Sequence, residues 1–278
     1  MSSSVVYRVA GIHSKQPWFV MSAAEYFSLF ASDDPMISHY YSFEADHTHG
    51  MTMAIPDGCV DIVFDCDPSA PNAVVCGTAV EATSARFIHK HRYFGVRYAP
   101  GLVPDFVKAS AAEMIDQKLN FLDAVPGAHS LFEQIVSEQD FARQVTLLKE
   151  FVAKRSTRKQ SAVTSLAVRT ILQHKGNLQM RDLEEVTGFT SRTVQRQFQD
   201  DLGLSPKAFS RMIRGQSAVY EINHSRHNKV AFSELACDLG FSDQSHFLRE
   251  FKKLVNATPL DYQNLVKQQT YLDRIRCC

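Results

Sequence analysis

The first hundred residues alternate between short apolar runs and turn-forming residues, a pattern typical of β-strands. The runs that we expect to form strands are Ile37–Phe43, Met51–Ile55, Val60–Phe64, Ala73–Cys76 and Tyr93–Tyr98. Tight turns are expected at Pro56-Asp57-Gly58 and at Asp67–Asn72. Short strands at this spacing predict a small antiparallel barrel or sandwich. Residues 17–31 follow the pattern less well, and a helical turn is one interpretation of them.

After Pro100-Gly101 the apolar residues recur at the longer period of helices. Ser110 and Glu113 have the spacing of a capping box, which predicts a short helix. A longer helix is expected over Glu138–Lys154, capped by Ser137. Its apolar stripe consists of Phe141, Val145, Leu148 and Val152. The polar and basic stretch Ala153–Ser161 is interpreted as an interdomain linker, with an extension of the preceding helix as the alternative.

From Val163 onward the pattern predicts only helices, and one arrangement occurs twice. LEEVTGFTSRTVQRQF (183–198) and LACDLGFSDQSHFLREF (235–251) share a short helix, a glycine, a hydroxyl cap and a second helix. The caps that we expect for the second helices are Thr190 and Ser242. Each copy is followed by a capped proline that opens a further helix, Ser205-Pro206 and Thr258-Pro259. We interpret the duplication as two helix-turn-helix units.

On a helical wheel, each second helix has an apolar stripe and an opposing polar face. Val194 and Phe198 form the first stripe and are expected to pack against Leu183 and Phe189. In the second helix, Phe247, Phe251 and Leu254 form the stripe. The opposing faces carry Arg192, Gln195, Arg196 and Gln199, then Gln244, Ser245, His246, Arg249, Lys252 and Lys253.

These polar faces carry the side-chain types that read DNA. Arginine bonds guanine bidentately, and glutamine does so with adenine. Hydroxyl, amide and lysine groups at the rim suit phosphates, and those expected there are Thr190, Gln199, Ser242, Lys252 and Lys253. Any single surface helix shows a comparable face, so it is the repetition of the whole arrangement that favours DNA binding. The intervening helix, from Pro206 to about Asn223, would be roughly 27 Å long. That length could hold the two units near the ~34 Å repeat of successive major grooves.

The formal net charge of zero hides an asymmetry between the two halves. Residues 1–153 contain 10 Lys+Arg against 18 Asp+Glu, whereas residues 154–278 contain 20 against 12. A basic half beside an acidic half indicates that only the former meets a polyanion. The sequence shows neither a membrane span nor a signal peptide, and its six cysteines lack metal-finger spacing. We therefore expect a cytoplasmic protein without membrane association.

The motifs of residues 160–267 resemble the DNA-binding domain of the AraC/XylS family of bacterial transcription regulators, most closely in LACDLGFSDQSHFLREFKKLVNATPLDY. The resemblance implies seven helices, with the two units joined by one long helix. It places base reading on Arg192, Gln195, Arg196, Gln244, Ser245, His246 and Arg249. Three residues depart from the family pattern: Gly215 in the long helix, Asn256 at a usual glycine and Gln263 at a common arginine. The last departure implies one phosphate contact fewer.

The N-terminal half resembles a poorly characterised sensor domain that is fused to such DNA-binding domains. IPDGCVDIVF (55–64) and FGVRYAPG (94–101) carry this resemblance. It implies a barrel for effector binding or dimerisation, and it names no ligand. The apolar stripe of Glu138–Lys154 could serve dimerisation or cover the barrel of its own chain.

Three groups in the N-terminal half are candidates for chemistry. His47 and His49 could bind a metal, although a solvated turn is favoured because no carboxylate follows closely. Cys59, Cys66 and Cys76 could form a redox switch, but we favour buried, inert thiols; Cys277-Cys278 is interpreted as a frayed tail. Arg97, inside an apolar strand, could bind an anionic effector or form a structural salt bridge. We expect no cofactor, and no spacing supports catalysis.

Together these observations predict an α+β protein. Residues 1–153 form a sensor or dimerisation domain that is β-rich to about residue 100, residues 154–161 form a linker, and residues 162–278 form the all-α DNA-binding domain. The predicted function is sequence-specific transcription regulation, with helices 191–201 and 243–255 in two successive major-groove segments. Expected partners are promoter DNA, a small-molecule or protein effector, RNA polymerase and a second copy of the chain. The alternative is a DNA-alkylation-repair protein with an AraC-like domain.

Overall fold

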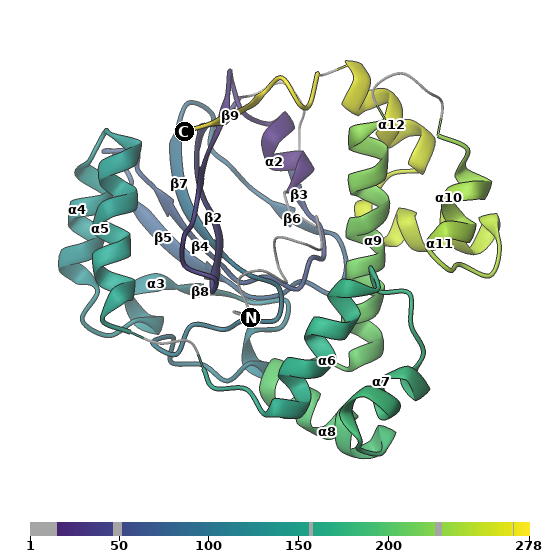
Figure 1. The fold of residues 1–278 in the computed structure, drawn as a ribbon. Helices are drawn as coiled ribbons and strands as arrows, with labels where there is room; N and C mark the ends of the chain where they lie inside the picture. The colour runs from purple at the N-terminus through teal and green to yellow at the C-terminus, as the bar shows by residue number, and fades with distance from the viewer. Residues whose placement is uncertain (1–15, 47–51, 156–157, 226–229, 269) are drawn as a thin grey trace.

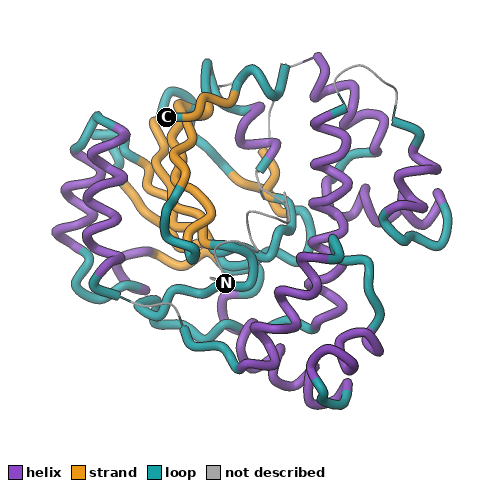
Figure 2. The backbone as a smooth tube through the Cα atoms, viewed as in Figure 1, coloured by secondary structure: helices purple, strands orange, loops and turns teal. Residues whose placement is uncertain are grey.

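The computed structural model describes residues 16–46, 52–155, 158–225, 230–268 and 270–278. The N-terminal half is rich in strands and the C-terminal half is mainly helical, which confirms the α+β class (Figure 1). Figure 2 shows the same division, with the strands gathered on one side of the long helix α9, Pro206–His224. None of the described helices is both long enough and apolar enough to cross a membrane.

Within the described residues, the strands form a seven-stranded sheet in the order β8-β5-β4-β7-β2-β1-β9 and a two-stranded sheet, β3-β6. The strand bounds are β1 Phe27–Ala31, β2 Ile37–Glu44, β3 Thr52–Ala54, β4 Asp61–Asp65, β5 Asn72–Cys76, β6 Thr83–Ala85, β7 Arg92–Tyr98, β8 Lys118–Asn120 and β9 Ile275–Cys277. All neighbours pair antiparallel except β1 and β9, which are parallel. The five expected strands are therefore present, to within a residue or two at their ends.

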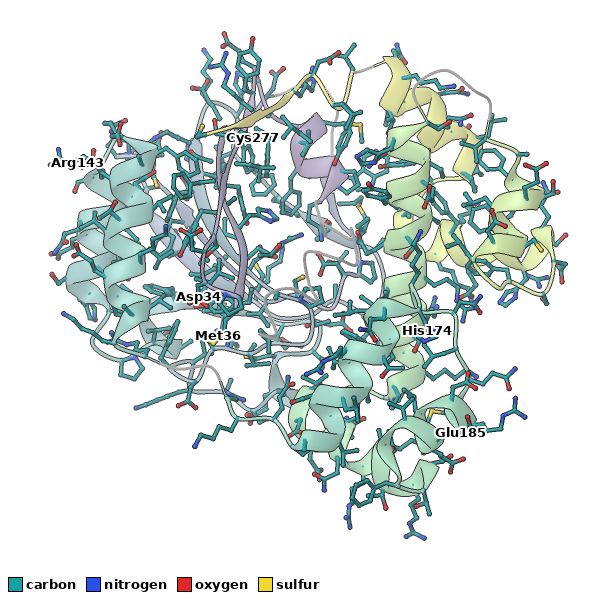
Figure 3. All side chains as sticks on the ribbon, viewed as in Figure 1. Asp34, Met36, Arg143, His174, Glu185 and Cys277 are labelled. Atoms are coloured by element: carbon teal, nitrogen blue, oxygen red, sulfur yellow. The ribbon has the colours of Figure 1, made fainter. Side chains whose placement is uncertain are left out.

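The last strand contradicts two expectations about the C-terminus. Residues after Val163 are not all helical, because β9 pairs with β1 at the edge of the N-terminal sheet. The backbone N–H of Cys278 donates to Leu29 O at 2.8 Å, so the final residues are not a frayed tail. Cys277 lies beside the sheet at the end of the chain (Figure 3). A three-residue strand carries too little periodicity to be detected in the sequence, and the unpaired edge of β1 supplies its partner.

The main sheet has two apolar faces because successive side chains point to opposite sides. On one face, Ile62, Phe64 and Val96 pack with Leu131 and Ile135 of the covering helices. These helices are α3 Phe121–Ala124, α4 His129–Ser137 and α5 Phe141–Ala153. The other face joins a cluster that includes residues of α2, Pro17–Met21, and of the C-terminal helices.

The expected cap at Ser137 is wrong. Ser137 is the last residue of α4, where its hydroxyl donates to Glu133 O at 2.7 Å. Asp140 caps α5 instead, accepting the backbone N–H of Arg143 at 2.8 Å. The chain turns between Ser137 and Asp140. The position at which one helix was predicted to start is therefore the end of α4, and α5 starts a few residues later. The capping box of Ser110 and Glu113 is present, ahead of the short helix η1, Ala112–Met114.

The apolar stripe of α5 is used within its own chain. Val145, Leu148 and Val152 are buried in the cluster beneath the sheet. This observation decides between the two roles that the sequence left open for the stripe, since a covered face cannot also pair with a second copy. After α5, Lys154, Arg155 and residues 158–160 form no helix or strand, and Arg158 donates to Val107 O at 2.8 Å.

The C-terminal half consists of helices arranged around α9 (Figure 1). Their bounds are α6 Ala162–Gln173, α7 Met180–Thr187, α8 Ser191–Leu202, α9 Pro206–His224, α10 Phe232–Asp238, α11 Gln244–Val255 and α12 Pro259–Gln268. Helices α6 to α8 pack with the first part of α9 in one apolar cluster, whereas α10 to α12 pack with its second part in another. The long helix is thus shared by both helix-turn-helix units.

The N-terminal half packs directly on the C-terminal helices. Gln216 Nε2 on α9 donates to Pro56 O at 2.9 Å, and Trp18 Nε1 donates to Val255 O at 3.1 Å. The backbone of Gly58 approaches the Phe209 ring so closely that an added Cβ would lie 2.5 Å from it. The β-rich half and the C-terminal helices therefore share an interface centred on α9.

Candidate nucleic-acid interface

The first unit is shaped by a left-handed glycine and a buried stripe. Gly188 ends α7 with φ of 73°, a conformation that glycine adopts without strain. Helix α8 then buries Val194 and Phe198 against the core that contains Leu183. Phe189 was expected in this core but is 49% exposed, because it follows the glycine turn on the outer side.

The start of α8 is fixed by α7 rather than by the expected cap. The side chain of Thr190 makes no capping bond and instead contacts the hydroxyl of Thr193 at 3.2 Å. Glu184 accepts both the hydroxyl and the backbone N–H of Ser191. These hydrogen bonds lower the pKa of Glu184 and hold the two helices of the unit at a fixed angle.

The predicted reading face of α8 lies in solvent. Arg192, Gln195, Arg196 and Gln199 are all exposed, on the side opposite the buried stripe. Thr190 is exposed at the same helix end. The arrangement presents two guanidinium groups and two amides from one rigid helix, which is the geometry that major-groove reading requires.

The second unit has a different cap from the predicted one. Asp243, not Ser242, caps α11, and its carboxylate accepts the backbone N–H of His246 at 2.7 Å. This hydrogen bond is the main cause of the lowered pKa of Asp243. Ser242 donates to the Asp243 carboxylate at 3.0 Å and contacts His246 Nδ1 at 3.1 Å. Asp243 rather than Ser242 caps α11 because it lies immediately before the helix and its carboxylate is a stronger hydrogen-bond acceptor than a hydroxyl.

The polar face of α11 is exposed for every predicted residue except one. Gln244, Ser245, Arg249, Lys252 and Lys253 are exposed, and Phe247, Phe251 and Leu254 are buried as expected. His246 is only half-buried, and its ring meets that of Phe241 edge-on at 5.4 Å. The histidine thus lies at the base of this polar face.

One arginine on α9 joins the two units. Arg214 Nη2 donates to Gly176 O at 2.9 Å, and its Nη1 donates to Gly240 O at 3.2 Å. Gly176 lies between α6 and α7, whereas Gly240 lies between α10 and α11, so the two acceptors belong to different units. The units also touch directly, because an added Cβ on Gly240 would lie 2.0 Å from Asn177 Oδ1. A cavity of about 380 Å³ lies between them and is lined by Arg214, His246 and Glu250 among others.

The structure accounts for the three departures noted in the sequence. A Cβ on Gly215 would lie 2.7 Å from Leu254 Cδ1, so the missing side chain lets α11 approach α9 closely. Asn256 ends α11 with φ of 60°, in the left-handed conformation expected for it. Gln263 is buried, with 4% of its surface exposed, and therefore does not reach the protein surface.

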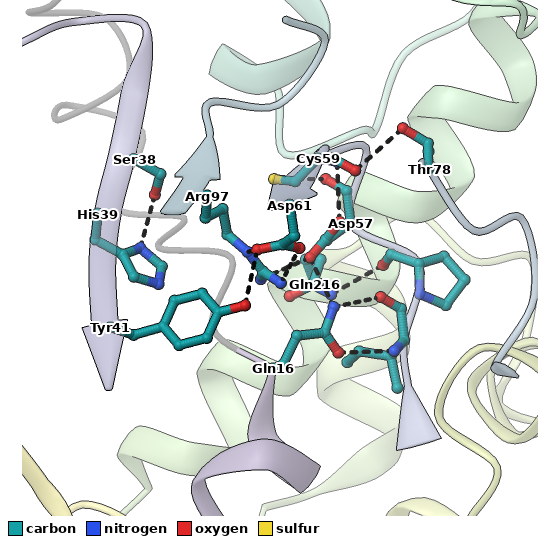
Figure 4. A network of polar contacts seen from close by, with 12 residues as sticks. Gln16, Ser38, His39, Tyr41, Asp57, Cys59, Asp61, Thr78, Arg97 and Gln216 are labelled. Carbon is teal, nitrogen blue, oxygen red and sulfur yellow. Dashed lines mark hydrogen bonds and ion pairs between the residues drawn. The ribbon is translucent and has the colours of Figure 1, made fainter. Parts of the chain in front are cut away.

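In the N-terminal half, the salt-bridge interpretation of Arg97 is the one observed. Its Nη2 lies 2.6 Å from Asp61 Oδ2, and its Nη1 lies 2.8 Å from Asp57 Oδ2. Figure 4 shows these groups with Gln16, whose Nε2 donates to the Asp57 carboxylate at 2.8 Å. Sequence reasoning missed Gln16 and both aspartates, although Asp57 stood in a predicted turn.

The remaining N-terminal candidates give no reactive site among the described residues. Cys59 and Cys66 are buried, and burial raises the pKa of the Cys66 thiol. Burial also raises the pKa of Cys76 to about 12, and the nearby Asp61 carboxylate adds to this effect. His47 and His49 lie outside the described residues, which themselves contain no cluster of metal-ligating side chains.

Two protein families match parts of the chain. Residues 183–265 match a family described as a helix-turn-helix domain, which covers the two units from α7 onward. Residues 34–120 match a family described as a domain of unknown function, DUF6597, which covers most of the sheet.

Curated relatives match part of the chain. An uncharacterized helix-turn-helix transcriptional regulator of Haemophilus influenzae is 29% identical over 101 residues, which are 36% of this chain and 33% of that protein. The transcriptional activator RhaS of Escherichia coli O157:H7 is 31% identical over 70 residues, 25% of this chain and 24% of RhaS. This chain therefore spans a third or less of the length of these two relatives.

Among solved structures, ToxT of Vibrio cholerae matches 81% of this chain and 97% of its own, with a TM-score of 0.44 and 11% identity. The relatives are transcriptional regulators, and neither they nor the structure support the DNA-repair alternative. The helix-turn-helix match and the named relatives agree with the duplicated units of the fold. Residues 183–265 are therefore a helix-turn-helix domain of the AraC type.

Proposed function

We propose that the protein is a sequence-specific, double-stranded-DNA-binding transcription regulator that places α8 and α11 in two successive major-groove segments. The observation that carries this proposal is the pair of exposed arginine- and glutamine-bearing helices held on one long helix. Helix α9 has 19 residues, which corresponds to roughly 28 Å at 1.5 Å per residue. Because the two polar faces differ, the expected binding site is asymmetric and spans about two turns of DNA.

Two kinds of contact follow from the chemistry of the exposed side chains. We assign base reading to Arg192, Gln195, Arg196, Gln244, Ser245, His246 and Arg249. We assign phosphate contacts to Thr190, Gln199, Ser242, Lys252 and Lys253. Contacts of the first kind discriminate between sequences, whereas those of the second kind add affinity for any sequence.

The charge distribution supports DNA as the partner of the C-terminal half alone. Residues 154–278 carry 20 Lys+Arg against 12 Asp+Glu, whereas residues 1–153 carry 10 against 18. The affinity should therefore fall steeply with salt, with a slope of about −0.9 in log K for each phosphate that is neutralised. The acidic N-terminal half would then bind partners other than DNA.

The proposal extends to partners and place of action. We propose promoter DNA and RNA polymerase as partners, an effector at the N-terminal half, and action in the cytoplasm without enzymatic activity. The covered stripe of α5 means that a homodimer would have to use another surface. The division into a sensor domain (1–153), a linker (154–161) and a DNA-binding domain (162–278) is part of the proposal.

A pair of variants on α11 tests the two kinds of contact. The affinities of the wild type, Arg249→Ala and Lys252→Ala would be measured on sites selected from a random DNA library. Both residues are exposed on the same helix. Arg249→Ala should cost ~1–3 kcal/mol at one or two base positions and relax the preference there. Lys252→Ala should weaken all sequences alike and make the salt slope shallower by about 1. Failure to enrich any sequence would contradict the proposal.

A further inference from the structure

A cavity of about 850 Å³ lies in the N-terminal half, between the main sheet and the two-stranded sheet. Its wall includes the inward side chains of β4, β5 and β7, together with Gln16 and Phe19 from the segment around α2. The volume falls within the ~300–1,000 Å³ range of small-molecule sites. It is the larger of the two cavities described above, and it borders the Arg97 network (Figure 4).

The buried part of this wall carries more negative than positive charge. Asp57 and Asp61 are 4% and 8% exposed, and both are paired with the single buried guanidinium of Arg97. The other cations that line the cavity, Arg86 and Lys118, are exposed and lie at its rim. Burial raises the pKa of Asp57 even with Arg97 beside it, so the guanidinium does not fully offset the desolvation of this carboxylate.

One part of the wall is apolar and aromatic. The Phe87 ring packs edge-on against Phe19, with centroids 4.9 Å apart, and lies 4.6 Å from that of Tyr93. All three rings line the cavity, as do Val63 and Val74. Aromatic faces attract cations as well as apolar groups, so this wall and the acidic floor favour the same kind of ligand.

We propose that this cavity is the effector site and that it takes an organic cation, a protonated amine on an apolar or aromatic body. The ammonium group would lie against the Asp57 and Asp61 carboxylates, and the hydrocarbon body would lie against the aromatic wall. The proposal rests on the regulatory function proposed above, because it names the effector class for the N-terminal half.

The floor of the cavity is connected to the DNA-binding half by short contacts. Gln16 holds the loop before β4 twice, since Ile55 N donates to its Oε1 at 2.7 Å and its Nε2 donates to Ile55 O at 2.8 Å. The next residue, Pro56, accepts the hydrogen bond from Gln216 on α9. An amine that changes the position of the Asp57 carboxylate therefore acts on the loop that touches α9.

The same loop also reaches a reading helix. Gly58 contacts the Phe209 ring of α9, and that ring packs edge-on against Phe198 with centroids 5.6 Å apart. Phe198 is fully buried on the inner side of α8. We infer that amine binding alters DNA affinity through residues 55–58, with Gln216 as a positioning residue.

Three ligands of matched shape test the chemical class. 3-Phenylpropylamine, 3-phenylpropanol and 3-phenylpropionate would be titrated calorimetrically into the full chain without DNA. The amine should bind at least tenfold more tightly than the alcohol or the carboxylate. At a 100-fold excess over its Kd, it should raise Tm by about 5 °C. If the alcohol or the carboxylate binds as well as the amine, or if none of the three binds, the assignment is wrong.

Variants of the wall locate the binding. Asp61→Asn should lower amine affinity at least tenfold, whereas Glu81→Gln, which changes an exposed carboxylate outside the lining, should leave it unchanged. Val74→Phe places a larger side chain in the cavity while keeping the Arg97 ion pairs, so it should weaken amine binding even if Asp61→Asn does not fold. Unchanged amine affinity in a folded Val74→Phe protein would place the amine elsewhere.

The connection to α9 is tested by measuring DNA affinity with and without the amine. Gln216→Met should keep the amine Kd but lose most of the amine-dependent change in DNA affinity. Ser217→Ala is the control, because its hydroxyl bonds Ile213 O within the same helix. If Gln216→Met responds to the amine like the wild type, the coupling step is overturned. DNA binding without amine tests the proposed function separately. A failure of the amine proposal can therefore be distinguished from a failure of the proposed DNA-binding function.

Discussion

Replacing Arg214 by methionine should loosen the relative placement of the two helix-turn-helix units. The guanidinium donates to one carbonyl in each unit, Gly176 O and Gly240 O, at 2.9 and 3.2 Å. Hydrogen bonds from charged donors contribute about 1.5–3 kcal/mol each. The longer bond is the weaker one and Arg214 is only half-buried, so we expect a loss of about 2 kcal/mol for the pair.

That loss should appear as a change in tolerance for the spacing of the two half-sites. Inserting one base pair between them rotates one half-site by ~34° relative to the other, which a rigid protein does not follow. We expect the insertion to weaken wild-type binding about 30-fold, and Arg214→Met binding only about 3-fold. On the natural spacing, the variant should bind about tenfold more weakly than the wild type, because it must order the two units on binding.

The assay is a gel-shift titration of each protein on DNA with the natural spacing and on DNA with the insertion. Lys207→Met is the matched control, because Lys207 is an exposed cation on α9 that lines the same cavity. Lys207→Met should lower the affinity for both DNAs equally, because one positive charge is lost. Its loss of affinity on insertion of the base pair should equal that of the wild type. A folded Arg214→Met protein that retains the 30-fold penalty would refute the bridging role of Arg214.

Two further predictions concern other parts of the chain. At pH 8, Ellman's reagent should modify the exposed thiol of Cys237 rapidly and that of the half-buried Cys76 much more slowly, because a pKa of about 12 leaves ~10⁻⁴ of the latter ionised. Labelling of Cys76 in the native protein as fast as that of Cys237 would contradict the raised pKa. Deleting residues 273–278 removes β9 and the bonds from Arg274 to Met21 O and Ala23 O, so Tm should fall by several degrees. An unchanged melting curve would mean that the strand adds no stability.

Local sequence was sufficient for the helices of the DNA-binding half. The short helix expected before the glycine of the first motif is present as α7, because an amphipathic stretch ends at a glycine that adopts a left-handed conformation. Caps were harder to predict. Ser242 and Asp243 are adjacent residues that both cap helices well, and the backbone conformation at Asp243 decided between them.

Sequence could not show contacts between distant segments. Arg97 was noticeable as a charge within an apolar strand, but its partner Asp61 is set by the antiparallel register of β4 and β7. Arg214 was one of two arginines on a predicted helix, and its role depends on two carbonyls that lie 38 and 26 residues away in the chain. Register and long-range packing depend on the whole fold, so no local pattern reports them.

The central claim, that α8 and α11 read two successive major-groove segments, is tested most directly by mapping base preferences helix by helix. The wild type, Arg196→Ala and Arg249→Ala would each select binding sites from the same random DNA library. The two variants should relax preferences at positions about one helical turn, ~10 base pairs, apart, and each should leave the other segment unchanged. Relaxation of the same positions by both variants, or a wild type without base preference, would contradict the account.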